Sequence, residues 1–371
     1  MLDTQKHIGT FYAAKQGYTE GVMEKRQLGK TDLEVSLICL GTMTWGQQNT
    51  QDEGFEQMDY AVENGINFFD TAELYAIPPT AETCGKTEEV IGNWFASRKC
   101  RDKIILATKI AGPGAHLSWI RNGERRYNRE HITAAIEGSL QRLQTDYIDL
   151  YQLHWPEREV NSFGKLDFPD TAEIREDEEY RMLGTLQILE EYIDKGVIRH
   201  IGLSNETPWG VMGFLQLAEK HSLSRVVSVQ NPYNLLNRSF EVGLSEIALQ
   251  EKCGLLAYSP LAGGALTGKY LNGAVPKGSR RDIDPRGSRY QKPHAESTIT
   301  RYVDIAKEAG LDPAQMALAF VNSRRFLTAN IIGATTMAQL KTNIASADLT
   351  LTDDVIAAIE AVHSDVPNPC P

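Results

Sequence analysis

Four polar residues in this chain could together deliver a proton to a carbonyl oxygen. Asp70, Lys109 and His154 each stand at the end of a short apolar run, and Tyr75 follows Asp70 by five residues. A phenol with an ordinary pKa of about 10 is a weak acid near neutral pH. An ammonium group at Lys109, kept charged by Asp70, should lower the pKa of Tyr75. His154 could then hydrogen-bond the same substrate oxygen.

Each of these residues, taken alone, also has a purely structural explanation. A buried Asp–Lys pair is often structural, and a histidine at a strand end is often only a satisfied hydrogen-bonding group. All four residues at matching positions are much harder to explain in that way. The set therefore indicates a site that stabilises an oxygen gaining negative charge as a hydride reaches the adjoining carbon.

Beyond Met23, short β-rich runs alternate with segments of helical period. This alternation implies parallel strands joined by right-handed crossovers. The predicted strands are Ser36–Leu40, Asn67–Asp70, Ile104–Lys109, Ile148–His154, Ile198–Ser204, Val226–Gln230, Leu255–Tyr258 and Ile331–Gly333.

The strand pattern favours a closed (β/α)8 TIM barrel over a doubly wound open sheet. An open sheet of that kind usually carries a G-x-G-x-x-G turn after its first strand. Here the turn reads Gly41-Thr42-Met43-Thr44-Trp45-Gly46, which does not match. In a barrel the carboxyl ends of all strands meet at one rim, so the four polar residues should converge there.

Helix-boundary residues support the segments between the strands. Thr207-Pro208 and Asp312-Pro313 are typical helix starts, and Gly196 follows a helix that ends near Lys195. The later predicted helices are Val211–Ala218, Glu241–Glu251, Thr298–Ala309, Pro313–Asn322, Met337–Ser346 and Asp353–His363.

The remaining segments complete the predicted domain organisation. Glu24–Val35 should form a β-hairpin at the barrel floor, and the long segments Trp155–Arg181 and Ser259–Ala295 should emerge at the catalytic rim. We expect residues 1–22 to be an N-terminal extension and residues 23–371 to be a single domain.

Composition narrows the classes of partner and compartment. A net charge of −11 argues against a nucleic-acid surface. No apolar stretch reaches the ~20 residues that span a bilayer, and the first 22 residues lack the apolar core of a secretory signal. The five cysteines have no metal-binding spacing and suggest reduced thiols. We therefore expect a cytoplasmic protein with no bound metal and no membrane or nucleic-acid partner.

Motifs spread along the chain match one family of reductases. They are Leu40-Gly41-Thr42-Met43, Phe69-Asp70-Thr71-Ala72-Glu73-Leu74-Tyr75, Thr108-Lys109, the run from Asp146 to Pro156, Ile201-Gly202-Leu203-Ser204-Asn205, Gln230-Asn231-Pro232-Tyr233, the run from Tyr258 to Gly264, and Gly333-Ala334-Thr335-Thr336. From Met23 to about His363 the chain resembles the aldo-keto reductases, in the branch of Tas-like proteins and potassium-channel β subunits.

The resemblance implies a role for each residue of the site. Tyr75 would be the general acid, Lys109 and Asp70 would tune its pKa, and His154 would orient the carbonyl group. NADP(H) would lie extended across the barrel mouth. The implied cofactor-binding residues are Gly41, Thr42, Met43, Asp70, Ser204, Asn205, Gln230, Tyr258, Ser259, Pro260, Leu261, Gly263, Leu266, Lys269, Arg280, Gly333, Gln339 and Asn343.

Within that set, each part of the cofactor has its own expected residues. The polar side chains of Ser204, Asn205 and Gln230 suit a carboxamide, and Tyr258 offers a ring face for stacking. The glycine-rich run Leu261–Leu266 would hold the pyrophosphate. The 2′-phosphate would meet Lys269 and an arginine, with the arginine left open between Arg280, Arg281, Arg286 and Arg289.

The expected reaction is NADPH-dependent reduction of an aldehyde or ketone. Trp45, Tyr75 and Trp155 should line the pocket for a small-molecule carbonyl substrate, whose identity and physiological direction the sequence leaves open. Two alternatives remain. One is a cofactor-sensing binding subunit with slow incidental chemistry, and the other is an oxidant of alcohols or sugars that uses the same residues in reverse. The oligomeric state is likewise open.

Overall fold

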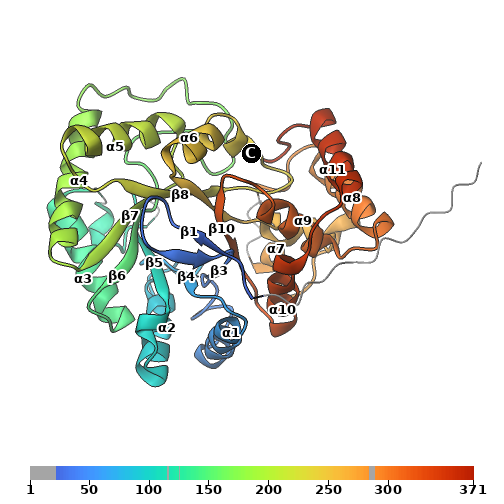
Figure 1. Ribbon diagram of the computed structural model, residues 1–371, viewed down its shortest axis with the longest axis horizontal. Helices are drawn as coiled ribbons and strands as arrows, with labels where there is room; N and C mark the ends of the chain where they lie inside the picture. Colours follow the sequence, from blue (N-terminus) through green and yellow to red (C-terminus); the bar gives the residue numbers. More distant parts are fainter. Residues whose placement is uncertain (1–21, 115–116, 125, 284–288) are drawn as a thin grey trace, which may run out of the picture.

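Parallel strands close into a barrel in the computed structural model, which describes residues 22–114, 117–124, 126–283 and 289–371 (Figure 1). Within those residues, eight strands follow one another around the barrel in the order β10-β3-β4-β5-β6-β7-β8-β9. They are β3 (Ile38–Gly41), β4 (Phe68–Asp70), β5 (Ile105–Ile110), β6 (Ile148–Leu153), β7 (Ile198–Ser204), β8 (Val226–Pro232), β9 (Gly254–Tyr258) and β10 (Leu327–Ile332). The predicted (β/α)8 barrel is confirmed.

Helices surround the barrel in Figure 1, and several begin at the predicted capping residues. Thr207 and Asp312 each cap a helix that has proline in its first turn. The helices are α1 (Gln51–Glu63), α2 (Lys86–Arg98), α3 (Arg129–Leu143), α4 (Glu178–Asp194), α5 (Pro208–Lys220), α6 (Leu244–Glu251), α7 (Arg280–Ile283), α8 (Ala295–Glu308), α9 (Pro313–Asn322), α10 (Met337–Ala345) and α11 (Asp353–Asp365).

The last barrel strand is longer than predicted. β10 begins at Leu327 and not at Ile331, because Thr328 and Asn330 interrupt the apolar run without leaving the sheet. Asn330 is buried, and its Nδ2 donates to Asn322 Oδ1 at 2.9 Å. A polar residue can therefore occupy a buried strand when a neighbouring side chain accepts its hydrogen bond.

The predicted hairpin closes the amino end of the barrel. β1 (Lys25–Gln27) and β2 (Glu34–Ser36) pair antiparallel and lie across the barrel strands in Figure 1. Leu28 and Val35 are fully buried in one apolar cluster with residues near the starts of the strands, such as Phe68. Among the described residues, the hairpin thus covers the barrel floor, and the large cavity is lined by residues of the opposite rim.

The long segments at that rim contain little regular structure. Residues 155–177 form no helix or strand, whereas the described residues of 259–283 and 289–294 contain the short helix α7 and two 3-10 turns. No helix among the described residues is long and apolar enough to cross a bilayer. The predicted extension, residues 1–22, lies outside the described residues except for Val22.

Candidate active site

Neighbouring barrel strands bring the four predicted catalytic residues together. Asp70 ends β4, Lys109 lies near the end of β5, and His154 directly follows β6. The Lys109 ammonium is fully buried and donates to Asp70 Oδ2 and to the Thr71 carbonyl, both at 2.7 Å. It also lies 3.5 Å from the Tyr75 hydroxyl. The predicted convergence is therefore present in the structure.

Two glutamines hold the second oxygen of the Asp70 carboxylate. Gln152 and Gln230 donate to Asp70 Oδ1 from their Nε2 atoms, at 3.1 and 2.8 Å. Both amides are buried, and Gln230 also donates to Gln152 Oε1 at 3.1 Å. These bonds fix the carboxylate that pairs with Lys109, and they connect a residue expected at the cofactor to the catalytic pair.

The pKa of Tyr75 differs from the sequence expectation. Burial raises this pKa above the ordinary value, Lys109 opposes that rise, and Asp70 adds to it. The lowering effect expected from Lys109 is therefore present, but burial outweighs it because the buried site disfavours a phenolate. For Lys109, burial acts to lower the pKa, but Asp70 and Tyr75 more than compensate, so the ammonium form persists.

His154 is poised as a neutral hydrogen-bonding group. Burial, with a smaller effect from Lys109, lowers its pKa well below the ordinary value. Its ring meets the Tyr75 ring edge-on, with centroids 5.8 Å apart. Its backbone is held by Ile110 O, which accepts from the His154 N–H at 3.1 Å, and by Asn205 Nδ2, which donates to His154 O at 2.8 Å. A neutral imidazole can donate to a carbonyl oxygen without carrying a charge.

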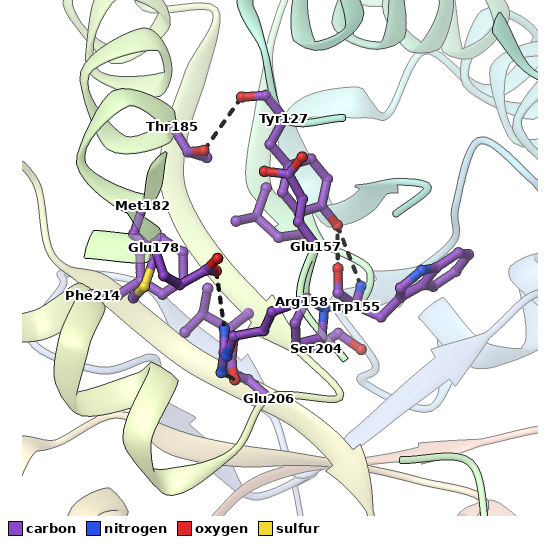
Figure 2. A pocket seen from close by; sticks show the side chains of 13 residues that line it. Tyr127, Trp155, Glu157, Arg158, Glu178, Met182, Thr185, Ser204, Glu206 and Phe214 are labelled. Carbon is purple, nitrogen blue, oxygen red and sulfur yellow. Dashed lines mark hydrogen bonds and ion pairs between the residues drawn. The ribbon is translucent and has the colours of Figure 1, made fainter. Parts of the chain in front are cut away.

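The wall beside His154 is braced from behind by Tyr127, a residue that the sequence analysis missed. Its hydroxyl donates to the Trp155 carbonyl at 2.5 Å and accepts from the Trp155 N–H at 3.4 Å (Figure 2). Arg158 pairs with Glu206, and both residues line a small pocket beside Tyr127 and Trp155 (Figure 2). Trp155 Nε1 donates to Pro113 O at 2.7 Å, which fixes the other end of the indole.

The loop between Asp70 and Tyr75 has its own anchor, also missed. Glu73 forms a two-pronged ion pair with Arg121 at 2.7 and 2.8 Å, and its Oε1 accepts from the Ala111 N–H at 2.5 Å. No sequence signal distinguished Glu73 from the other residues of its motif, since its partner lies 48 residues away. This anchor holds the loop that carries Tyr75 against the end of β5.

A cavity of about 1510 Å³ opens above the catalytic cluster at the carboxyl ends of the strands. It exceeds the ~300–1000 Å³ of an ordinary ligand pocket, so an extended dinucleotide and a substrate fit together. Leu266 is buried and does not line it. The expected cofactor residues that do line it are Gly41, Thr42, Met43, Asp70, Ser204, Asn205, Gln230, Tyr258, Ser259, Pro260, Leu261, Gly263, Lys269, Arg280, Gly333, Gln339 and Asn343.

Part of the cavity lining has the chemistry of a phosphate site. Lys269, Arg280 and Arg281 line it, and the Arg281 guanidinium lies 4.2 Å from the centre of the Tyr270 ring. The amino end of α10, capped by Thr336, lines the same cavity. Cationic side chains and a helix amino terminus both favour an anion. Of the other arginines left open, Arg289 lines the cavity beside Tyr258, and Arg286 lies outside the described residues.

The donors expected for a carboxamide lie beside the catalytic cluster. Ser204 Oγ donates to Gln230 O at 2.9 Å, and Asn205 Nδ2 lies 3.1 Å from Ser204 Oγ. The Tyr258 hydroxyl donates to Asn205 Oδ1 at 2.7 Å, which places the Tyr258 ring at the same part of the cavity. These polar groups and the cationic side chains line one large cavity, so the donor set fits a dinucleotide. In the described residues, no cluster of three or more His, Cys, Asp or Glu side chains could hold a metal ion.

Trp45 is the substrate-pocket residue that the structure places elsewhere. It is fully buried, does not line the cavity, and donates from Nε1 to Gln57 Oε1 of α1 at 3.1 Å. Its ring packs against Gly54, so it belongs to the layer between the barrel and α1. Trp45 does follow a strand end, as predicted, but the prediction that its side chain lines the cavity is wrong. Tyr75 and Trp155 do line the cavity.

Comparisons with known proteins agree with this geometry. The family model described as the aldo/keto reductase family matches residues 37–364. The chain is 50% identical over 349 residues to "Protein tas" of Escherichia coli, which covers 94% of this chain and all of that protein. It is 34% identical to "Uncharacterized oxidoreductase YrpG" of Bacillus subtilis, over 92% of this chain and 96% of that one.

A plant relative belongs to the second group named by the sequence motifs. The "Probable voltage-gated potassium channel subunit beta" of Arabidopsis thaliana is 29% identical over 357 residues, covering 93% of this chain and 98% of that protein. The relatives thus include both Tas-like and channel-β-like proteins. With its closed barrel and a family match over most of its length, the chain belongs to the aldo/keto reductase family of oxidoreductases.

Proposed function

We propose that this protein reduces an aldehyde or ketone to an alcohol with NADPH. The observation that carries the proposal is the buried Asp70–Lys109 pair beneath the Tyr75 hydroxyl, with His154 beside it, at the base of a large cavity. A proton donor and a hydrogen-bond donor that converge on one point suit an oxygen that becomes an alkoxide.

Each residue has one task in the proposed reaction. NADPH, when bound, would supply the hydride to the carbonyl carbon. Tyr75 then donates its hydroxyl proton to the carbonyl oxygen, and the Lys109 ammonium stabilises the phenolate that remains. His154 donates a hydrogen bond to the same oxygen from its neutral ring. Asp70 keeps Lys109 charged and in place.

The proposed cofactor assignment follows the chemistry of the cavity. Ser204, Asn205 and Gln230 would hold the carboxamide, and Tyr258 would contact the nicotinamide ring. Lys269 and Arg280 line the same cavity, where their cationic side chains would bind the dianionic 2′-phosphate. That charge is the reason to propose NADPH and not NADH.

The cofactor choice can be tested by binding. Titration of the protein with NADPH and NADH, followed by fluorescence, should show tighter binding of NADPH by at least about 10-fold. Lys269→Ala should weaken NADPH and leave NADH nearly unchanged, because only NADPH carries the 2′-phosphate. Equal affinity for both dinucleotides in both proteins would contradict the assignment.

A cofactor-sensing subunit is the second candidate, and the similarity to the plant protein named as a probable potassium-channel subunit favours it. Steady-state turnover with NADPH over a panel of aldehydes and ketones separates the two candidates. Reduction of at least one carbonyl compound well above background supports the enzyme. Tight NADPH binding without turnover on any member of the panel would favour the sensor.

A further inference from the structure

The cavity contains a cationic group that the proposed reaction does not use. The Arg289 guanidinium lines the cavity, and its Nη1 donates to the Tyr258 hydroxyl at 3.3 Å. Its other contacts are ring faces, with Phe163 and Tyr258 at 5.6 and 5.8 Å from its central carbon. Among the described residues, no carboxylate lies within ion-pair distance of Arg289.

A short chain of hydrogen bonds places Arg289 at the catalytic end of the cavity. The His154 carbonyl accepts from Asn205, Asn205 accepts from the Tyr258 hydroxyl, and that hydroxyl accepts from Arg289. The first two bonds measure 2.8 and 2.7 Å. Arg289 therefore lies near the residues that would receive the carbonyl group.

The surroundings of Arg289 would strengthen an interaction with an anion. Trp155 lines the pocket beside His154, and Phe163 meets it edge-on with centroids 6.1 Å apart. Phe163 in turn contacts Arg289, so two aromatic rings lie between His154 and the guanidinium. Lys292 donates to the Gly164 carbonyl, which ties together the two rim segments that carry Phe163 and Arg289. Apolar walls reduce the screening of a charge by water.

The acidic residues of the same rim are engaged elsewhere or exposed. Glu157 pairs with Arg181, and Glu206 pairs with Arg158. Glu159 also lines the cavity but is exposed and forms no ion pair with Arg289. A guanidinium has five donors, and this one has no carboxylate of the described part of the chain within ion-pair distance, so it suits an incoming planar, two-oxygen anion.

We propose that Arg289 binds a carboxylate on the substrate, so that the preferred substrates are aldehydes or ketones that carry an acidic group. The inference rests on the proposed function, because it names the substrate class of the same site. Arg289 would be a specificity residue, and the reacting carbonyl would remain with Tyr75 and His154. The other possible source of the anion is the cofactor pyrophosphate, and the experiment distinguishes the two.

The test compares matched carbonyl compounds with and without a carboxylate. The quantity measured is kcat/KM for two pairs of compounds: 4-carboxybenzaldehyde with benzaldehyde, and succinic semialdehyde with butanal. Each compound is tested with the wild type, Arg289→Ala and Arg289→Lys. Arg175→Ala is the control, since it removes a positive charge from the rim segment 155–177 and does not line the cavity. NADPH affinity is measured for every variant by fluorescence.

We expect the wild type to prefer the carboxylated member of at least one pair. Arg289→Ala should lower kcat/KM for that compound by roughly 10- to 100-fold, the effect of losing a hydrogen bond to a charged group. In Arg289→Ala, kcat/KM for the uncharged compound of the pair and the NADPH affinity should change by less than about 2-fold. In the Arg175→Ala control, kcat/KM for both compounds should also change by less than about 2-fold. Arg289→Lys should recover part of the preference for the carboxylated compound, because lysine keeps the positive charge but cannot donate two parallel hydrogen bonds to a carboxylate.

Two results would overturn the proposal. If Arg289→Ala weakens NADPH binding and slows both members of a pair equally, the arginine serves the cofactor. If the variant has no effect, or if the wild type shows no preference, Arg289 does not select the substrate.

Calorimetric titration with benzoate and benzamide gives a readout independent of turnover. Benzoate alone should bind the NADPH-saturated wild type and should bind Arg289→Ala more weakly by a similar factor. Loss of this difference would refute the anion site even if the protein catalyses no reduction, so the two proposals fail separately.

Discussion

Tyr75 keeps its proton in this site because burial disfavours the phenolate more strongly than the Lys109 charge favours it. That balance suits an acid that must stay loaded until negative charge develops on the substrate oxygen. His154 has the complementary property, because burial keeps its imidazole neutral. At the residue scale, protonated Tyr75 would therefore serve as the proton donor and neutral His154 as the hydrogen-bond donor.

These pKa directions predict the pH dependence of reduction. Since the pKa of Tyr75 is raised and that of His154 is lowered, neither group changes its protonation between pH 6.5 and about 9. The catalytic efficiency with 4-nitrobenzaldehyde should be level over that range and should fall only as pH rises through the pKa of Tyr75. NADPH affinity measured at each pH is the control. If the efficiency drops by about 10-fold or more while the pH is still below 9, the assigned groups titrate differently.

The Asp70–Lys109 pair should be costly to break on one side. Lys109→Met leaves the Asp70 carboxylate buried without its cation, and such a loss costs about 3–5 kcal/mol of folding free energy. In urea unfolding, the double variant Asp70→Asn/Lys109→Met should be more stable than Lys109→Met alone, because it removes the unpaired charge. All of these variants should lose reductase activity. Simple additivity of the two stability losses would mean that the pair is not coupled.

At the scale of elements, tight helix packing and two braces position the site. Helices α2 and α3 touch at Gly92, where an added Cβ would overlap the Arg142 carbonyl oxygen and lie 2.8 Å from the Leu143 carbonyl carbon. The Glu73–Arg121 pair braces the loop of Tyr75, and Tyr127 braces the strand end of His154 and Trp155. The catalytic geometry therefore depends on contacts behind the cavity.

The helix contact predicts opposite effects for two glycine substitutions. Gly92→Ala should destabilise the protein by about 1–3 kcal/mol, because a backbone carbonyl has no flexible end that can move aside. Gly184→Ala, in α4, should be neutral or stabilise by up to about 1 kcal/mol, since an added Cβ there meets nothing within 4 Å. Thermal unfolding of both variants measures the difference. Equal effects would show that α2 and α3 can separate without cost.

The hydrogen bonds of Tyr127 to the Trp155 backbone predict that loss of its hydroxyl lowers kcat/KM but not NADPH affinity. Tyr127→Phe removes the hydrogen bonds to the Trp155 backbone and should cost about 1 kcal/mol of stability. We expect kcat/KM to fall by about 3- to 10-fold through loss of the His154–Trp155 position, while NADPH affinity stays unchanged. If only stability changes, Tyr127 supports the fold and not the reaction.

The elements were predictable to different degrees. Seven strand positions followed from apolar runs that end in polar residues, but the start of β10 did not, because Thr328 and Asn330 disguise it. The convergence of the four proposed catalytic residues could be predicted because strand ends in a barrel share one rim. Trp45 could not be placed, since sequence gives a position after a strand and not the direction of a side chain.

The Glu73–Arg121 ion pair and the candidate anion site at Arg289 could not be predicted from the sequence, because each joins residues that are far apart in the chain. Glu73 and Arg121 lie 48 residues apart, and Phe163 and Arg289 belong to different rim segments. No period or motif connects such pairs. The sign of the Tyr75 shift also needed the structure, because it depends on burial and not only on the neighbouring charges.

In the whole molecule, the apolar hairpin that stabilises the barrel and the residues of the candidate active site lie at opposite ends of the barrel. The hairpin seals the floor with Leu28 and Val35, whereas the opposite rim carries the cavity, the catalytic cluster and the long segments. Lys269 and Tyr75 both line this cavity, where we propose that they serve the cofactor phosphate and the substrate carbonyl. The cavity volume of about 1510 Å³ would allow the proposed cofactor and a small substrate to bind together.

Single-turnover kinetics test the central claim most directly. Protein saturated with NADPH is mixed with excess 4-nitrobenzaldehyde, and NADPH oxidation is followed by absorbance for the wild type and for Tyr75→Phe. The wild type should oxidise its bound NADPH rapidly, whereas Tyr75→Phe should bind NADPH equally well and react at least about 100-fold more slowly. Oxidation by Tyr75→Phe at the wild-type rate would show that another group supplies the proton.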